Sequence, residues 1–494
     1  MSVQTKSLAI ALLFFSTLQA QWNQIGSNIN GEASNNYSGI SVSTSSNGSI
    51  VAIGAYGNTA NGVFTGHARV YQNINNVWTQ IGQDIDGDTE YDQMGISLSI
   101  SADGTILAVG AFGNDGGESD AGVTRVFKYQ NENWLQIGDD IYGESLGDYS
   151  GISVSLSADG TTVAIGADSN ANNQGVTGHV RVYENQGGNW TQIGQDIDGE
   201  VSFEQFGFRL SLSRDGSVVA ISAVDSNVGG TDSGQVRIFE NQGGNWVQLG
   251  NSIDGEAAGD LFGFSVSTNN DGSVVAIGSH RNDGNGSDSG QVRVFEFQGE
   301  NWIPYGTTLL GAAEGDGFGI SVSLTPDASK LAVGAFRNDE NGVDTGQVKV
   351  FEFSGGDWIQ YENTMEGDEI DERFGYSVSL NEDGSILASG AYSNNGNGQD
   401  SGTVRVFGDG FLSVSENIFN QTNVYPNPAT NTVYISSSYQ LYNLKIFNVL
   451  GQLIVNKPLS GTETNIDISE LNTSVYIFKI ETEKGSFSKS IIKQ

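Results

Sequence analysis

Short segments in which hydrophobic and polar residues alternate run through most of the chain. One group of four such segments reads FGFSVSTN over 262–269, SVVAIGS over 273–279, QVRVFEF over 291–297 and NWIPYG over 301–306. Alternation with a period of two is typical of β-strands that bury one face. Since segments with the period of a helix are missing from the sequence, we predict an all-β chain.

This group of strands recurs every 56 residues. Two series of glycines keep that register, one starting at Gly31 and the other at Gly39. A fixed period of this size indicates an array of supersecondary units. All seven tryptophans lie at the same interval, and they are Trp22, Trp78, Trp134, Trp190, Trp246, Trp302 and Trp358.

Four antiparallel strands in each of seven repeats predict a seven-bladed β-propeller. Most repeats carry a tight Asp-Gly turn between their first two strands, as at Asp103-Gly104, which suits a two-residue hairpin. The strand of Trp22 precedes the first repeat, whereas the last repeat ends at Phe407 without a tryptophan strand. We therefore expect the N-terminal strand to complete the last blade, which closes the ring and removes two exposed sheet edges.

The recurring tryptophan has two interpretations. On the fourth strand of a blade it would fill the wedge between adjacent blades, or it would offer a stacking surface for sugars. Sevenfold repetition at one strand position favours the packing role, because ligand sites rarely need so many copies.

Short motifs accompany the glycine series. Phe-Gly occurs at 206–207, 262–263, 318–319 and 374–375, and Gly-Ala follows at 110–111, 166–167, 334–335 and 390–391. In these motifs residues 22–407 resemble FG-GAP repeats, the blades of integrin-α-type propellers. The resemblance implies a propeller, but such folds host many functions. The calcium loop of the integrin type, DxDxDGxxD, is absent from this sequence, so we do not transfer calcium from that family.

The first 20 residues have the pattern of a secretory signal peptide. Lys6 supplies a positive charge, residues 8–15 are hydrophobic, and Ala20 precedes the expected cleavage site. We therefore predict a signal peptide over 1–20 and an extracytoplasmic propeller over 21–410. No later stretch of the sequence is long and hydrophobic enough to span a membrane, and the absence of cysteine excludes disulfides.

The composition changes after Gly410, where a predicted linker over 411–423 leads into a segment at 424–494. The strand pattern and length of this segment suit a small Ig-like β-sandwich. Its motif residues are Tyr425, Pro426, Asn427, Pro428, Gly451, Lys489 and Lys493. With these residues it closely resembles the type A C-terminal sorting domain of the type IX secretion system of Bacteroidetes. The resemblance implies that the type IX machinery recognises this domain and exports the protein, which is then released or attached to the outer-membrane surface.

The net charge is −37, from 58 acidic and 21 basic residues. A charge of this sign and size repels nucleic acid and anionic membranes, and it favours solubility, cations or a basic partner. We expect a monomer without a nucleic-acid partner.

Acidic residues recur on the two long loops of each repeat, which we expect on one face of the propeller. Such residues commonly accept backbone N–H groups and fix the shape of a loop. The alternative is that carboxylates of neighbouring blades share a calcium ion, which needs six to eight oxygen ligands. The first series is Asp92, Asp148, Glu204, Asp260, Asp316 and Glu372, with Asn36 in the remaining repeat, and the second is Asp120, Asp232, Asp288, Asp344 and Asp400.

Groups suited to catalysis are few. The histidines are His67, His179 and His280, and they form no metal-binding motif of known spacing. His67 and His179 occupy nearly equivalent repeat positions, so we expect them to be solvent-exposed or to serve packing. An arginine series on the third strand is expected to form repeated ion pairs or a solvated strand face. Its members are Arg69, Arg125, Arg181, Arg237, Arg293 and Arg405, with Lys349 in the remaining repeat.

These observations predict a secreted or cell-surface binding or adhesion scaffold that is not an enzyme. It would bind a protein, glycan or cation on its long-loop face and need no cofactor, with calcium as the one candidate. The alternative is a secreted polysaccharide hydrolase or lyase that uses acidic residues on the same face. The regular repeats favour the scaffold, because a catalytic site normally breaks repeat symmetry.

Overall fold

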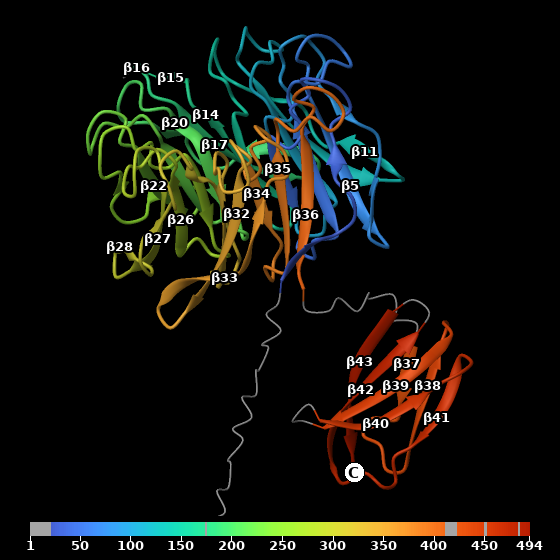
Figure 1. Ribbon diagram of the computed structural model, residues 1–494. Coiled ribbons are helices and arrows are strands. Elements are labelled where there is room, and N and C mark those ends of the chain that lie inside the picture. Colours follow the sequence, from blue (N-terminus) through green and yellow to red (C-terminus); the bar gives the residue numbers. More distant parts are fainter. Residues whose placement is uncertain (1–20, 173–174, 411–421, 449–451, 483–484) are drawn as a thin grey trace, which may run out of the picture. The chain divides into compact units, whose positions relative to one another are not determined.

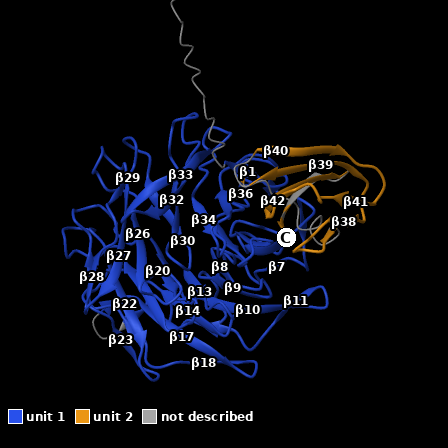
Figure 2. Ribbon diagram, turned by 90° about the horizontal axis from the view of Figure 1, so that it is seen from below, with its two compact units in different colours: residues 1–409 blue, residues 410–494 orange. Residues whose placement is uncertain are grey.

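The computed structural model describes residues 21–172, 175–410, 422–448, 452–482 and 485–494. These residues form strands and no helix, so they contain no helix that could cross a membrane. The chain divides into two compact units, residues 1–409 and 410–494 (Figure 2). The predicted signal peptide and most of the predicted linker lie outside the described residues.

Unit 1 is a β-propeller in which seven sheets follow one another along the chain (Figure 1). Blade 1 contains β3 (Ser41–Thr44), β4 (Ile50–Ala55), β5 (His67–Ile74) and β6 (Val77–Gln80), and blade 2 contains β8 (Ser97–Ile100), β9 (Ile106–Ala111), β10 (Val123–Gln130) and β11 (Asn133–Gln136). Blade 3 contains β13 (Ser153–Leu156), β14 (Thr162–Ala167), β17 (His179–Gln186) and β18 (Asn189–Gln192), and blade 4 contains β20 (Phe206–Leu212), β21 (Val218–Ala223), β22 (Gln235–Asn241) and β23 (Trp246–Gln248).

The remaining three blades have the same plan. Blade 5 contains β25 (Ser265–Thr268), β26 (Val274–Ser279), β27 (Gln291–Gln298) and β28 (Asn301–Pro304), and blade 6 contains β30 (Phe318–Leu324), β31 (Lys330–Ala335), β32 (Gln347–Ser354) and β33 (Asp357–Glu366). Blade 7 contains β34 (Ser377–Leu380), β35 (Ile386–Ala391), β36 (Thr403–Asp409) and β1 (Trp22–Gln24). Short strands pair with the third strand of six blades, namely β2 (Ile29–Asn30), β7 (Ile85–Asp86), β12 (Ile141–Tyr142), β19 (Ile197–Asp198), β24 (Ile253–Asp254) and β29 (Leu309–Leu310). In blade 3, β15 (Ala171–Asn172) and β16 (Gly175–Val176) form a hairpin in the long loop after β14.

The N-terminal strand closes the ring, as the sequence predicts. β1 pairs antiparallel with β36, with Trp22 opposite Asp409, and β2 continues along the same strand. The backbone N–H of Trp22 also donates to Oδ1 of Asn363 in β33 at 2.8 Å, which links the closing strand to blade 6. The last blade is therefore made from both ends of the propeller sequence.

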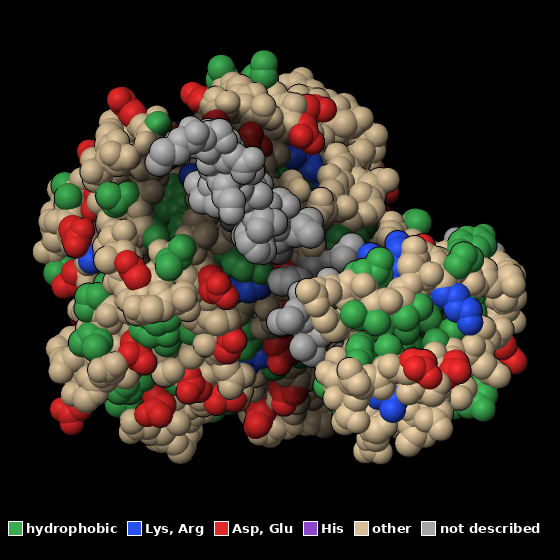
Figure 3. Space-filling view, turned by 60° about the horizontal axis from the view of Figure 1, so that its bottom comes forward, with side chains coloured by type: hydrophobic (Ala, Val, Ile, Leu, Met, Phe, Trp, Pro, Cys, Tyr) green, Lys and Arg blue, Asp and Glu red, His purple; other side chains and the backbone are tan. Residues whose placement is uncertain are grey.

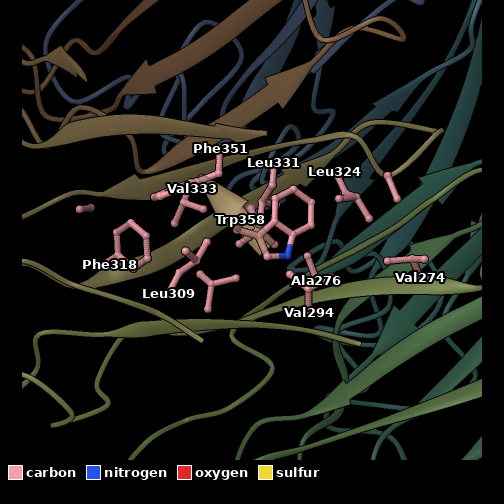
Figure 4. Close-up of a cluster of buried hydrophobic side chains, with 14 residues drawn as sticks. Val274, Ala276, Val294, Leu309, Phe318, Leu324, Leu331, Val333, Phe351 and Trp358 are labelled. Carbon is pink, nitrogen blue, oxygen red and sulfur yellow. The ribbon is translucent and has the colours of Figure 1, made fainter. Parts of the chain in front are cut away.

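The tryptophans pack between blades, which confirms the packing interpretation. Trp358 lies in a buried cluster with Val274 and Ala276 of blade 5 and with Leu331 of blade 6 (Figure 4). Its Nε1–H donates to the carbonyl oxygen of Tyr305 in the preceding blade at 2.8 Å. The equivalent bond to the preceding blade, at 2.8 to 2.9 Å, is made by Trp78, Trp134, Trp190, Trp246 and Trp302.

The innermost strands hold one another through serines around the central channel. Ser97 Oγ donates to the carbonyl oxygen of Gly151 in the next blade at 2.7 Å. The Gly110 backbone lies so close to Gly151 that an added Cβ would be 2.0 Å from that carbonyl oxygen, so only glycine fits there. This contact explains why six of the seven repeats have a serine and two glycines at these positions, whereas the fourth repeat has Arg209 and Ser222 in place of the serine and the first glycine.

Unit 2 is a β-sandwich. One sheet contains β37 (Thr422–Tyr425), β38 (Thr432–Ser437) and β41 (Glu463–Asp467), and the other contains β40 (Leu453–Pro458), β39 (Leu441–Asn448), β42 (Ser474–Thr482) and β43 (Gly485–Lys493). Buried residues of both sheets, such as Val433 and Phe478, belong to one hydrophobic cluster. The two sheets therefore pack face to face.

Candidate functional site: the channel mouth on the long-loop face

The propeller encloses a central cavity of about 220 Å³ that all seven inner strands line. The long loops between the second and third strands, and between successive blades, lie at the top of unit 1 in Figure 1. We call the end of the channel on this side the channel mouth. Around most of the cavity the seven blades present similar residues, such as Ile96, Ser97 and Leu98 of blade 2.

Arg209 of β20 breaks this symmetry. The other six blades carry serine at the equivalent position, namely Ser41, Ser97, Ser153, Ser265, Ser321 and Ser377. The half-buried Arg209 guanidinium lies over the ring of Phe208 at 4.3 Å and near that of Phe264 at 5.6 Å. Its Nη1 donates to the carbonyl oxygen of Phe208 at 3.0 Å.

The charge of Arg209 is only weakly balanced. In the described part of the chain no ion pair joins its guanidinium to a carboxylate. Burial lowers the pKa of Arg209 below its usual range, and more distant Tyr376 and Asp168 offset this in part.

Eight rings continue from Arg209 around the channel mouth, and we call them the aromatic arc. Each ring contacts the next, with centroids 4.2 to 6.3 Å apart. Two further guanidiniums lie over the arc, Arg337 over Phe336 at 4.8 Å and Arg373 over Tyr392 at 5.6 Å. The arc runs through blades 4 to 7 and on into blade 1 in the order Phe208, Phe264, His280, Phe336, Tyr376, Tyr392, Tyr37 and Tyr56.

Two carboxyl groups lie beyond the end of the arc. Asp168 stands directly after β14, at the position that Tyr56 and His280 occupy in their blades. Burial raises the pKa of Asp168 to about 6, with Arg209 opposing and Asp225 of the next blade adding to the rise. Burial also raises the pKa of Asp225, and Asp232 adds to it. The channel mouth therefore combines cations, half-buried rings and two interacting carboxyl groups.

The first series of predicted loop carboxylates is buried and bonded to the backbone. Asp92 is fully buried, and its Oδ2 accepts N–H bonds from Asp88 at 2.8 Å and Thr89 at 2.9 Å. Asn36 accepts the equivalent bonds from Glu32 and Ala33 in its blade. These contacts are the ones expected if the side chains accept backbone N–H groups and fix the shape of the loop. Asp148, Glu204, Asp260, Asp316 and Glu372 are buried in the same way and also accept backbone N–H bonds.

The second series has another local role. Asp120 has a φ of 53°, and its backbone N–H donates to Oδ1 of Asp115 at 2.7 Å. Aspartate tolerates this left-handed conformation better than most residues. Among the described residues, no group of three potential metal ligands includes any member of either series. Asp232, Asp288, Asp344 and Asp400 have the same positive φ as Asp120.

The arginines of the series are largely buried and each pairs with a carboxylate, so the solvated strand face is wrong for them. Arg237 is 2% exposed and pairs with the equally buried Glu204 at 2.5 Å. His67 and His179 are also buried at 1% exposure, so a solvent-exposed role is wrong for them too. Burial, together with a neighbouring arginine, lowers the pKa of each of these histidines to about 4. On the face that Figure 3 shows, acidic side chains are spread over the larger unit.

In unit 2 the predicted sorting residues lie near the C-terminal strand. Oδ1 of Asn427 accepts the backbone N–H of Ile492 in β43 at 2.8 Å, and both Pro426 and Pro428 follow cis peptide bonds. Tyr425 is exposed and stacks on Tyr434. Lys489 and Lys493 lie on β43, where the Nζ of Lys493 donates to the carbonyl oxygen of Gln494 at 2.6 Å. Gly451 lies outside the described residues.

The channel mouth was missed in the sequence, although a signal was present. Arg209 stands where the repeat has serine, and Asp168 stands where other repeats have aromatic residues. Departures from a repeat at positions near the ends of the inner strands could have pointed to the mouth.

Two families match parts of the chain. The family described as secretion system C-terminal sorting domain matches residues 423–494, and the FG-GAP repeat family matches residues 253–295 and 310–351. These matches confirm both resemblances. No curated protein matches the chain.

Solved structures of other propellers resemble the chain more distantly. A protein of Bacteroides uniformis, provisionally named a 6-phosphogluconolactonase, has a TM-score of 0.46 and 12% identity over 67% of this chain and 86% of its own. The Dos1 propeller has a TM-score of 0.45 and 13% identity over 79% of this chain and 96% of its own. PorZ, a surface component of the type IX secretion system of Porphyromonas gingivalis, has a TM-score of 0.44 and 14% identity over 94% of this chain and 60% of its own. Likenesses this distant carry no argument about ligand or activity.

Proposed function

We propose that this chain, a type IX secretion cargo with FG-GAP repeats and a C-terminal sorting domain, is a non-enzymatic protein that binds an acidic glycan at the channel mouth. The sorting domain directs the propeller to the cell surface or the extracellular space. An acidic glycan here means a sugar chain with carboxylate or sulfate groups. Such chains are ligands that a secreted propeller would meet outside the cell.

The observation that carries the proposal is the unpaired guanidinium of Arg209. An arginine at this position must be desolvated without a carboxylate partner. An anionic ligand removes that cost. A guanidinium also binds carboxylate or sulfate oxygens with two parallel hydrogen bonds, which gives orientation as well as affinity.

The aromatic arc supports a sugar as the carrier of the charge. The apolar C–H faces of a sugar ring pack well on aromatic side chains that also offer a polar group, as tyrosine does. Tyr37, Tyr376 and Tyr392 are half-buried, so their rings remain partly accessible. A cavity of about 220 Å³ lies below the range of about 300–1,000 Å³ usual for small-molecule sites. It therefore suits one charged sugar, with the rest of the chain over the loops.

Binding of the full-length protein to acidic and neutral polysaccharides tests the proposal. We expect Arg209→Ser to weaken binding of an acidic chain by about 10- to 100-fold, the usual contribution of a charge-assisted hydrogen bond. Arg214→Ser is the matched control, because Arg214 lies in the same blade on the opposite, short-turn side and pairs with Glu382. Equal binding by wild type and Arg209→Ser would overturn the proposal, as would a lack of binding to any acidic chain.

A second candidate function is cleavage of the same glycan, by a hydrolase or a lyase reaction. It is favoured by the interacting carboxyls of Asp168 and Asp225, one of them with a pKa of about 6, since two carboxyl groups in different protonation states suit acid–base chemistry. Incubation of the wild type with bound glycans, with detection of new chain ends, separates the two functions. Chain cleavage that Asp168→Asn abolishes would make the protein an enzyme.

A further inference from the structure

Two clusters of histidine and carboxylate lie away from the channel, at the long-loop ends of the third strands. The first rim cluster is Glu32, His67 and Asp84, and the second is Glu144, His179 and Asp196. In each cluster one ligand atom from every residue lies within 4.8 Å of the others. The two clusters occupy the same repeat positions, two repeats apart. We propose that each rim cluster binds one zinc ion.

The strongest observation is the state of the His67 imidazole. It is 1% exposed, and neither ring nitrogen has a hydrogen-bond partner. Nδ1 lies 3.7 Å from Oδ2 of Asp84 and 3.8 Å from Oδ1 of Asp86, and these distances are too long for hydrogen bonds. Two ligands on a tetrahedral zinc ion are about 3.4 Å apart, given bonds of about 2.1 Å. The imidazole is thus aimed into a space of the size that an ion between the three groups requires.

The charges at the cluster also favour a dication. Glu32, Asp84 and Asp86 supply three carboxylates, and Arg69 supplies one guanidinium that pairs with Glu32 at 3.3 Å. Two negative charges therefore remain without a cation. Oδ1 of Asp86 is a buried atom without a hydrogen-bond partner. One imidazole with carboxylate oxygens is a donor set that zinc accepts in proteins.

Blade 2 shows what happens where the histidine is missing. Val123 takes the histidine position there. The aspartate of that blade, Asp140, then forms a two-pronged pair with Arg125 at 3.0 to 3.1 Å. Arg125 also pairs with Asp88, which stands at the glutamate position of blade 2, at 2.5 Å. In the two histidine blades the equivalent arginines pair with the glutamate, as Arg69 does with Glu32 and Arg181 with Glu144. Among the described residues, the aspartate therefore lacks an arginine partner in the two blades that carry the histidine.

The groups around the clusters fit a metal site in two further respects. Asp84 accepts a hydrogen bond from Nε2 of Gln80 at 2.6 Å, and Asp196 accepts one from Gln192 at 2.7 Å. Such contacts orient carboxylates that bind metals. Asp84 and Asp86 also line a surface cleft of about 330 Å³.

A zinc ion at each rim cluster would connect neighbouring blades. Glu32 follows β2, which belongs to the closing blade 7, whereas His67 and Asp84 belong to blade 1. Glu144 follows β12 of blade 2, and its partners belong to blade 3. The first ion would therefore fasten the ring at its closure, and bound zinc would raise the melting temperature.

Calorimetric titration of the metal-free, full-length protein with zinc chloride tests this assignment. We expect two sites for the wild type, one for His67→Gln or His179→Gln, and none for the double variant. Asp140→Asn in blade 2 is the matched control and should keep two sites. Circular dichroism of each variant checks that it is folded.

Cobalt(II) provides a second measurement. Its visible d–d absorption should appear in the wild type, fall by half in either single variant and vanish in the double variant. Zinc should raise the melting temperature of the wild type and leave that of the double variant unchanged. A wild type that binds no zinc, or variants that bind as much as the wild type, would overturn the assignment. Because glycan binding is measured separately, its failure would leave this test intact.

Discussion

Trp22 in the first strand of the propeller lies directly opposite Asp409 at the end of the last propeller strand. Its indole is 3% exposed and packs against blade 6, yet its Nε1–H has no hydrogen-bond partner. At the other six blade boundaries the tryptophan Nε1–H donates to a backbone carbonyl. The closure of the ring thus repeats the packing of the other boundaries without their hydrogen bond.

This difference predicts unequal costs for one substitution. Trp246→Phe removes the bond to the carbonyl oxygen of Ile193 at 2.9 Å and leaves that oxygen unsatisfied, whereas Trp22→Phe removes none. We expect Trp246→Phe to lower the free energy of unfolding by about 1–3 kcal/mol more than Trp22→Phe. Denaturant unfolding followed by circular dichroism measures both. Equal costs would contradict the prediction.

Arg209→Ser should stabilise the propeller while it weakens binding of the acidic glycan. The substitution removes a poorly compensated cation from the channel. We expect the free energy of unfolding to rise by about 1 kcal/mol. Thermal denaturation measures it, and Ser265→Ala, which should lower stability by a similar amount, is the control. A lower melting temperature for Arg209→Ser would show that the arginine is structural.

Stability should fall in acid because of the buried histidines. Burial, with nearby arginines, lowers the pKa of His67 and His179 to about 4 and that of His280 to about 3, from 6.5. Between these values and pH 6.5 the unfolded chain binds protons that the folded chain does not, so this contribution is complete above pH 6.5 and is lost as the pH falls toward 4. Each histidine contributes on the order of 3 kcal/mol to this loss in the free energy of unfolding.

Melting temperatures across this pH range check the histidine effect. His280→Gln should give a shallower fall between pH 6.5 and 4 than the wild type. Asp168 acts in the opposite direction, because burial raises its pKa to about 6 from 3.8 and its protonation stabilises the fold below pH 6. Identical slopes for wild type and His280→Gln would contradict the prediction.

The loop carboxylates should tolerate asparagine but not alanine. Asn36 already makes in one blade the backbone bonds that Asp92 makes in the next. We therefore expect Asp92→Ala to lower the free energy of unfolding by about 1–3 kcal/mol and Asp92→Asn by less. Denaturant unfolding compares the two variants. Millimolar calcium should leave the melting temperature of the wild type unchanged, and a clear rise would return these carboxylates to the list of metal ligands.

Deletion of residues 424–494 should stop export of the propeller. The segment matches a secretion system sorting domain, which the type IX machinery must recognise before the cargo leaves the cell. We expect the truncated protein to accumulate in the periplasm, as measured by immunoblots of cell fractions. Asp467→Asn is a control within the same domain, because Asp467 is an exposed residue outside the sorting motif. Truncated protein in the medium at wild-type levels would contradict the assignment.

The strands, the repeat and the closed ring could all be predicted from the amino-acid sequence. Alternating residues such as those of 273–279 report burial within one strand, and the spacing of Trp22 to Trp358 reports how often a blade recurs. The missing tryptophan strand after Phe407 was enough to place the N-terminal strand. These features depend on the alternation of residues within a strand and on the number and spacing of the repeats, and a single sequence contains both.

Which polar groups meet could be learned only from the three-dimensional fold. Tyr37 and Tyr392 stand at opposite ends of the propeller sequence, and closure of the ring places their rings 6.3 Å apart in the aromatic arc. His67 gains Glu32 as a neighbour in the same way, because the segment after β2 returns to the start of blade 1. Contacts of this kind depend on the closure of the ring and on the burial of each side chain, and neither follows from the spacing of residues along the chain.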